Sequence, residues 1–172
     1  MKRMLVVAMA LAIAPLFAPV FGPIRAEAAT LEFPSDAPIA SVTIPDAWEP
    51  KETISGIEAT SPDAAIYFSI DVASDATMDQ VINDAIKFLT DNGVTIDETT
   101  KSDSGDIEIN GMTFGSIEFD GTDADGPVEV SLGFASPSEG KMLVVTYWGT
   151  KETQGSHSKD LVAILKSLKP AK

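Results

Sequence analysis

The chain has 172 residues, a single histidine and no cysteine, and it carries a formal net charge of −14 at pH 7. This charge disfavours binding to nucleic acid and to anionic membrane surfaces, because both repel an acidic protein. One histidine without cysteine excludes a zinc site of the common His/Cys type and a Cys–His nucleophilic pair. The chain also lacks a Gly-x-Ser-x-Gly nucleophile elbow and a P-loop, so nothing supports a kinase or an ATPase.

The first 28 residues have the layout of a secretory signal peptide. Met1–Arg3 is a short positive head, Met4–Phe21 is an apolar run, and Ala26–Ala28 supplies small residues at the two positions that a signal peptidase reads. We therefore predict cleavage after Ala28 and a periplasmic or secreted location. The alternative is an uncleaved membrane anchor, which the prolines within the apolar run disfavour.

The predicted mature chain has the size of one ordinary domain. We expect an extended lead-in over residues 29–40 and a single domain over residues 41–172. A chain of this size buries about 68% of its unfolded surface without disulfides. No cysteine follows the signal peptide, which excludes a lipoprotein anchor, and after cleavage we expect no stable membrane anchor. Both arginines lie in the signal peptide, so the mature chain has no guanidinium clamp for phosphate or carboxylate.

Three short strands are predicted at the start of the domain. Ser41–Ile44 is a short strand that Pro45 ends. Thr53–Thr60 and Ile66–Val72 alternate apolar with polar residues, as half-buried strands do. Pro62-Asp63 provides the turn between them, so we expect a hairpin.

A helix is predicted from Thr77 onward. Thr77 and Gln80 have the spacing of a capping box, and Asn92-Gly93 ends the helix because glycine readily takes the left-handed conformation. The apolar residues between these signals recur at helical spacing and form one stripe: Met78, Val81, Ile82, Ala85, Ile86 and Leu89.

Further strands follow this helix. Residues Val94–Lys101 lead into Ile107 and Ile109. Asn110-Gly111 follows and is a strong signal for a two-residue hairpin turn. In Met112–Phe119 the apolar residues change parity, so we expect a bulge near Gly115-Ser116. Met142–Trp148 is apolar at nearly every position, which is typical of a central strand covered on both faces.

The remaining elements are one strand and a closing helix. Val128–Phe134 alternates apolar with polar residues. The closing helix is expected to be capped by Ser156 or Ser158 and ended by Pro170. Its apolar stripe consists of Leu161, Ile164, Leu165 and Leu168.

This order of elements predicts an α+β fold, with an antiparallel β-sheet covered by helices on both faces. Four features carry a family resemblance: the segment Ile44–Trp48, the strand pair split by Pro62-Asp63, the long helix from Thr77, and the closing segment Ile164–Pro170. In these features the chain resembles the PsbP-like and DcrB-like superfamily. The resemblance implies an α-β-α sandwich and an accessory or binding protein rather than an enzyme, and it transfers no catalytic residue.

Two polar segments are candidates for chemistry. His157 lies among serines and a lysine at a helix start, so we expect a surface residue rather than a catalytic one. The turn around Asp120, Asp123 and Asp125 is either a polar hairpin turn or a weak, open calcium site. It does not match an EF-hand loop, because the residue types at its ligand positions are not those that an EF-hand requires. Asp103–Asp106 has the same two interpretations.

Four large amphipathic aromatic residues are candidates for a docking or ligand patch: Trp48, Tyr67, Tyr147 and Trp148. Their alternative role is to complete the core beneath the helices. Tyr147 and Trp148 are adjacent in one strand, so they must point to opposite faces of the sheet.

We assign no catalytic, cofactor-binding or metal-binding residue from the sequence, and no cofactor. The leading prediction is a non-catalytic, exported accessory or protein-binding domain of the bacterial cell envelope. Its partner is expected to be another envelope or secreted protein, and a basic one would fit its charge. The alternative is a small-ligand or weak Ca²⁺-binding periplasmic protein. A hydrolase would need His157, or a carboxylate pair such as Asp120 with Glu129.

Overall fold

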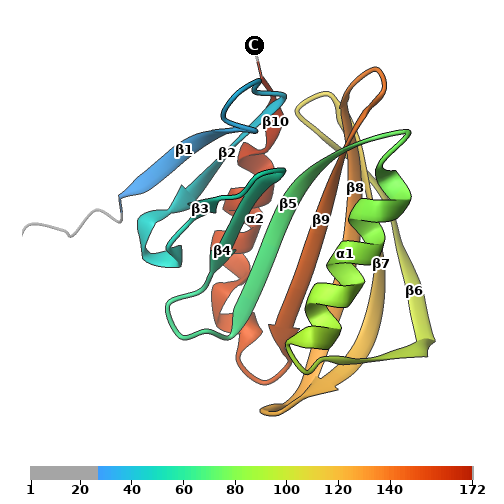
Figure 1. The fold of residues 1–172 in the computed structure, drawn as a ribbon. Helices are drawn as coiled ribbons and strands as arrows, with labels where there is room; N and C mark the ends of the chain where they lie inside the picture. Colours follow the sequence, from blue (N-terminus) through green and yellow to red (C-terminus); the bar gives the residue numbers. More distant parts are fainter. Residues whose placement is uncertain (1–26, 172) are drawn as a thin grey trace, which may run out of the picture.

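The computed structural model describes residues 27–171, which form two β-sheets and two α-helices (Figure 1). In chain order the elements are β1 (Ala28–Phe33), β2 (Ala40–Pro45), the 3-10 helix η1 (Asp46–Trp48), β3 (Lys51–Glu52), β4 (Gly56–Thr60), β5 (Ile66–Ser74), α1 (Met78–Asp91), β6 (Thr95–Ile109), β7 (Met112–Asp123), β8 (Gly126–Ser138), β9 (Lys141–Thr150), the 3-10 helix η2 (Gln154–His157), α2 (Ser158–Ser167) and β10 (Lys169–Pro170).

The larger sheet has seven strands in the order β3-β4-β5-β9-β8-β7-β6, and neighbouring strands are antiparallel. The predicted β4–β5 hairpin is present, and β9 lies in the middle of the sheet, as its doubly apolar sequence predicts. Leu143 and Val144 are adjacent in β9 and both fully buried. They point to opposite faces, so both faces are covered at the centre of the sheet.

A separate three-stranded sheet, β1-β2-β10, was not predicted. The strand expected at residues 41–44 lies here as β2. The expected lead-in is also partly a strand, since β1 pairs with β2 from Ala28 opposite Pro45 to Phe33 opposite Ala40. The short β10, just after α2, pairs with the other edge of β2. These pairings join segments far apart in the sequence, and local patterning does not reveal them. The predicted signal peptide lies outside the described residues apart from its last two, Glu27 and Ala28.

The turn between β6 and β7 forms as predicted. Asn110 and Gly111 both have positive φ, 49° and 84°, as a two-residue hairpin turn of this kind requires. The predicted bulge is wrong in its position. β7 pairs with β8 without interruption, whereas the pairing is irregular at two places in β6, between Asp97 and Ser102 and between Asp103 and Asp106, the second of them opposite Ser116. β7 needs no bulge, because its apolar residues point to both faces of the large sheet. Phe114 belongs to one hydrophobic cluster and Phe119 packs against the other.

Both helices occur where predicted, but their predicted caps are wrong. Thr77 precedes α1 without capping it, since its Oγ1 accepts from the backbone N–H of Ser74 at 2.9 Å. Before α2, the hydroxyl groups of Ser156 and Ser158 donate to carbonyl groups of the preceding 3-10 turn. The end of α1 is as predicted, with Gly93 at φ 86°.

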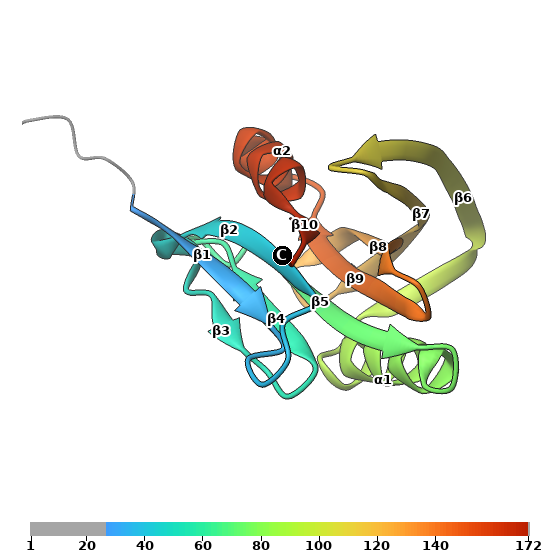
Figure 2. The same cartoon turned by 90° about the horizontal axis from the view of Figure 1, so that it is seen from above.

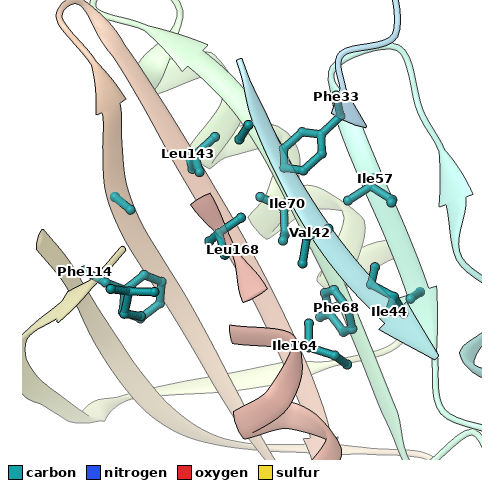
Figure 3. Close-up of a cluster of buried hydrophobic side chains, with 14 of the residues drawn as sticks. Phe33, Val42, Ile44, Ile57, Phe68, Ile70, Phe114, Leu143, Ile164 and Leu168 are labelled. Carbon is teal, nitrogen blue, oxygen red and sulfur yellow. The ribbon is translucent and has the colours of Figure 1, made fainter. Parts of the chain in front are cut away.

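The two helices lie on opposite sides of the large sheet (Figure 2). They therefore contact strand residues of opposite parity. On one face, α2 and the small sheet together pack on β4, β5 and β9. This core includes Phe33, Ile44, Phe68, Leu143 and Leu168 (Figure 3). On the other face α1 packs through a smaller cluster around Leu89.

The α+β class is therefore present, but the expected cover of both faces by helices is only partial. Much of one face is covered by the small sheet rather than by a helix, and β6 is exposed along nearly its whole length. Within residues 27–171, no helix has both the length and the apolar character needed to cross a membrane.

Candidate functional site

His157 differs from the exposed residue expected, because only 15% of its side chain is exposed. Its Nε2 lies 2.9 Å from each carboxylate oxygen of Asp63, and its ring meets the buried Trp48 edge-on with centroids 5.5 Å apart. Asp63 also accepts from Ser61 Oγ and from the backbone N–H of Ala65. These hydrogen bonds, that of His157 first, hold the pKa of Asp63 well below its ordinary value of 3.8. His157 thus ties the start of α2 to the β4–β5 turn.

The acidic turn between β7 and β8 uses its carboxylates internally. Asp123 accepts from the backbone N–H groups of Asp125 and Gly126, at 2.8 and 3.1 Å, and from Trp148 Nε1 at 3.0 Å. Asp120 pairs with Lys151. Among the described residues, no group of three acidic or histidine side chains is arranged to hold a metal ion. The second acidic segment lies at the irregularity in β6, where the carboxylate of Asp103 accepts from the backbone N–H of residue 105.

The four aromatic residues do not form one patch. Trp48 is 1% exposed and packs against Phe68 in the core. Tyr147 and Trp148 lie on opposite faces of β9, as predicted: Tyr147 packs against the α2-side core and Trp148 against the α1-side cluster. Tyr67 also lies on the α1 side, where it stacks on Phe88. The aromatic residues therefore divide between the core and two separate hollows.

The first hollow, here named the α2 groove, is an apolar cavity of about 270 Å³ between α2 and the large sheet. Gly133 allows Phe114 to lie across the floor, because a Cβ at residue 133 would come within 2.5 Å of the Phe114 ring. The lining is mostly apolar: Phe68, Ile70, Phe114, Val145, Tyr147, Leu161, Ile164, Leu165 and Leu168, with Ser116, Glu129, Ser131 and Gly133.

The α2 groove has a polar side formed by three linked side chains. Tyr147 Oη donates to Gln154 Oε1 at 2.6 Å, and Gln154 Nε2 donates to Glu129 Oε2 at 3.1 Å. Gly149 leaves room for this network, since a Cβ there would lie 2.3 Å from both Gln154 Oε1 and Tyr147 Oη. Burial, followed by the charge of Glu129, raises the pKa of Tyr147 well above its ordinary value of 10.0. Glu129 thus sets a carboxylate beside an apolar hollow.

The second hollow, the α1 pocket, has a volume of about 470 Å³ and lies between α1, β5 and the β3–β4 turn. Its lining is more polar: Thr53, Ile54, Ser55, Glu58, Tyr67, Ser69, Asp71, Val81, Asp84, Ala85, Phe88 and Thr146. The ring of Tyr67 stacks on Phe88 with centroids 4.8 Å apart, and its hydroxyl donates to Glu58 at 3.2 Å. Burial, and then the charge of Glu58, raises the pKa of Tyr67 well above 10.0.

Asp71 is held in place at this pocket by two hydroxyl groups. Its Oδ1 accepts from Ser55 Oγ at 2.6 Å and its Oδ2 from Ser69 Oγ at 3.0 Å. No sequence pattern marked Glu58, Asp71 or Glu129 as lining residues of the two hollows. Glu58 and Asp71 occupy the polar parity of the predicted β4–β5 hairpin, so their common face was available as a signal. The sequence carried no signal that these two residues lie close to α1, because this closeness depends on how the helix packs.

Comparison with known proteins identifies the fold. No family model and no curated protein matches the chain in sequence. Among solved structures, cyanobacterial PsbP (CyanoP) from Synechocystis sp. PCC 6803 matches with a TM-score of 0.57 and 7% sequence identity, over 87% of this chain and 96% of that one. The fold is PsbP-like. The resemblance that the sequence suggested is thus confirmed at the level of the fold.

Two further structures are similar at lower TM-scores. LpqN of Mycobacterium tuberculosis, described as involved in cell envelope biogenesis, has a TM-score of 0.48 and 12% identity, over 85% of this chain and 91% of LpqN. PA94 of Pseudomonas aeruginosa, described as a putative regulator of unknown function, has a TM-score of 0.40 and 15% identity, over 84% of this chain and 98% of that chain. These scores are too low to add to the assignment of the fold.

Proposed function

We propose that this protein is an exported, non-catalytic accessory protein of the bacterial cell envelope that binds another protein through the α2 groove. The observation that carries the proposal is the groove itself, an apolar hollow of about 270 Å³ with the carboxylate of Glu129 in its lining. A hollow of this kind accommodates an apolar side chain of a partner, and burial of such an anchor provides much of the affinity at protein interfaces.

The charge of the chain favours a basic partner. The net charge of −14 includes the signal peptide, whose predicted removal takes away three basic residues and one acidic residue and leaves the chain more acidic. We therefore expect the partner segment to combine an apolar anchor for the groove with a lysine or arginine near Glu129. Complementary charge of this kind accelerates association and makes it sensitive to salt.

A binding role is also favoured over catalysis by the state of the single histidine. Nε2 of His157 is held by Asp63, and the His157 ring is packed against the buried Trp48. A histidine acting in general acid–base catalysis needs a nitrogen within reach of substrate. The PsbP-like fold agrees with a binding role, because the resemblance implies accessory and binding proteins.

Site-specific photocrosslinking in the host organism tests this function. A photoreactive residue replaces Leu165 at the groove, and a matched control replaces the exposed Asp125 at the β7–β8 turn. We expect one protein to crosslink from position 165 and not from 125.

A binding measurement on the purified pair completes the test. The pair should bind at about 50 mM salt, and its affinity should fall several-fold at about 300 mM. Leu161→Asp should abolish binding and Leu161→Met should retain it. Equal crosslinking from both positions, or affinity independent of salt, contradicts the proposal.

Export is tested separately, on the protein purified from the envelope fraction of the host. N-terminal sequencing and intact mass are expected to show a chain that begins at Ala29. Replacing Ala28 with leucine should block processing, because a signal peptidase requires a small residue there. A cytosolic protein that retains residues 1–28 contradicts the proposed location without affecting the argument for the α2 groove.

A further inference from the structure

The α1 pocket contains carboxylates that no basic side chain neutralises within residues 27–171. Glu58, Asp71 and Asp84 line the pocket together, and no lysine or histidine lines it with them. The ion pairs among the described residues are Lys87–Asp91, Lys151–Asp120 and His157–Asp63, so none involves the three pocket carboxylates. Such a group of acidic side chains attracts a cation, but acidic residues alone do not define a site.

A buried hydroxyl group in the same pocket provides an independent observation. Thr146 is 1% exposed, and its Oγ1 has no hydrogen-bond partner among the described residues. It lies in β9 directly opposite Ser69, whose hydroxyl donates to Asp71. Leaving a buried hydroxyl unpaired is costly, and such groups in native proteins are usually satisfied. A donor entering the pocket would complete the hydrogen bonding of Thr146 close to the carboxylate of Asp71.

The remaining lining is suited to an apolar stem and to a cation above an aromatic ring. Ile54 is 100% exposed in the turn between β3 and β4, although it borders the pocket. The stacked rings of Tyr67 and Phe88 form part of the lining, and aromatic faces attract ammonium and guanidinium groups. The pocket thus combines apolar and aromatic surface with carboxylates.

We propose that the α1 pocket binds an organic cation, a guanidinium or alkylammonium group on a short apolar stem. The cationic head donates to Asp71, Glu58 and Thr146 Oγ1, and the stem lies against Ile54 and Phe88. The site is independent of the proposed function, because it lies on the opposite face of the sheet from the α2 groove. The same head group can come from a free small molecule or from a basic side chain of a protein.

Titration with defined probes, followed by NMR of the isotope-labelled protein, tests this site. The probes are n-butylguanidinium, n-butylammonium and the neutral analogue n-butylurea. We expect saturable shifts of the Tyr67 and Phe88 ring signals with both cations, and none with the urea. A blocked Gly-Gly-Arg-Gly-Gly peptide distinguishes the sources: tighter binding than butylguanidinium indicates a protein side chain, and weaker binding indicates a free small cation.

Four variants locate the effect. Glu58→Gln and Asp71→Asn should each weaken cation binding by about fivefold, as expected for a partly exposed charge pair. Asp79→Asn removes one negative charge from α1 at a residue outside the pocket lining and should leave the affinity unchanged. Thr146→Val removes the unpaired hydroxyl, so it should raise the melting temperature of the unliganded protein and weaken binding. Thr146→Val also tests the site if the Asp71→Asn variant fails to fold. Absence of saturation, equal binding of butylurea, or equal effects of Glu58→Gln and Asp79→Asn overturns the proposal.

Discussion

The two faces of the large sheet differ in how they are held. On the α2 side, residues of eight strands and α2 form one continuous core that joins the small sheet to the large one. On the α1 side, the buried cluster consists of Leu89, Val94, Val128 and Val130, and a polar hollow lies beside it. Both faces use the same strands, β5 and β9, whose alternate residues point in opposite directions. One face therefore carries most of the apolar packing, whereas the other combines a thinner apolar contact with unneutralised charge.

The sharpest comparison is between two fully buried leucines, Leu143 on the α2 side and Leu89 on the α1 side. We expect Leu143→Ala to lower the free energy of unfolding by about 4 kcal/mol and Leu89→Ala by about 3 kcal/mol. The central strand β9 is fixed by neighbouring strands on both sides, so it cannot collapse into the cavity that Leu143→Ala leaves. The helix α1 can shift towards the sheet and partly fill the cavity that Leu89→Ala leaves. Urea unfolding measures both values. A larger loss for Leu89→Ala would break the proposed difference between the faces.

A second comparison uses two glycines near the α2 groove. Gly149→Ala places a Cβ 2.3 Å from Tyr147 Oη and Gln154 Oε1, whereas nothing lies within 4 Å of a Cβ at Gly155. We expect the first change to cost about 1–3 kcal/mol and the second less than about 0.5 kcal/mol. Thermal unfolding gives the two costs. Equal values would show that the Tyr147–Gln154 pair adapts without penalty.

The two tyrosines of the chain report on the two hollows. Tyr67 and Tyr147 both have a pKa raised well above 10.0 by burial first and then by a nearby glutamate. A raised pKa means that the folded state retains the proton, so stability falls as the pH rises above 10.0. Ultraviolet titration should therefore show no tyrosinate near pH 10 until unfolding begins. Glu58→Gln should lower the pKa of Tyr67 alone, and Glu129→Gln that of Tyr147 alone. A normal titration in the native protein contradicts both assignments.

The smallest effect is expected at Asp63, which joins the β4–β5 turn to the start of α2. Its pKa is lowered, chiefly by the hydrogen bond to His157, so its contribution to stability is fully present above its unfolded value of 3.8. The contribution is lost as the pH falls below that value, because the carboxylate must take up a proton. Asp63→Asn should therefore flatten the acid side of the stability profile, with little effect on Tyr67 or Tyr147. Urea unfolding at several acidic pH values measures the profile, and an unchanged acid limb would contradict the pairing.

Elements with local sequence signals could be predicted before the structure was known. Alternation placed β4, β5 and β8, the doubly apolar run placed β9 in the centre, and Asn110-Gly111 placed the β6–β7 turn. The sequence also predicted that Tyr147 and Trp148 face opposite ways. These predictions succeeded because side-chain periodicity and turn conformation depend on neighbouring residues only.

Features that join distant segments became apparent only in the folded chain. The pairing of β2 with β1 and β10, the bulge in β6, and the contact of His157 with Asp63 and Trp48 depend on chain segments that meet only after folding. The same holds for both hollows. Glu129 lies beside an apolar groove because α2 packs there, and Asp71 and Thr146 line one pocket because α1 crosses β5 and β9. A polar residue on a strand is an ordinary surface residue until a helix closes over its neighbours, and long-range packing determines where that occurs.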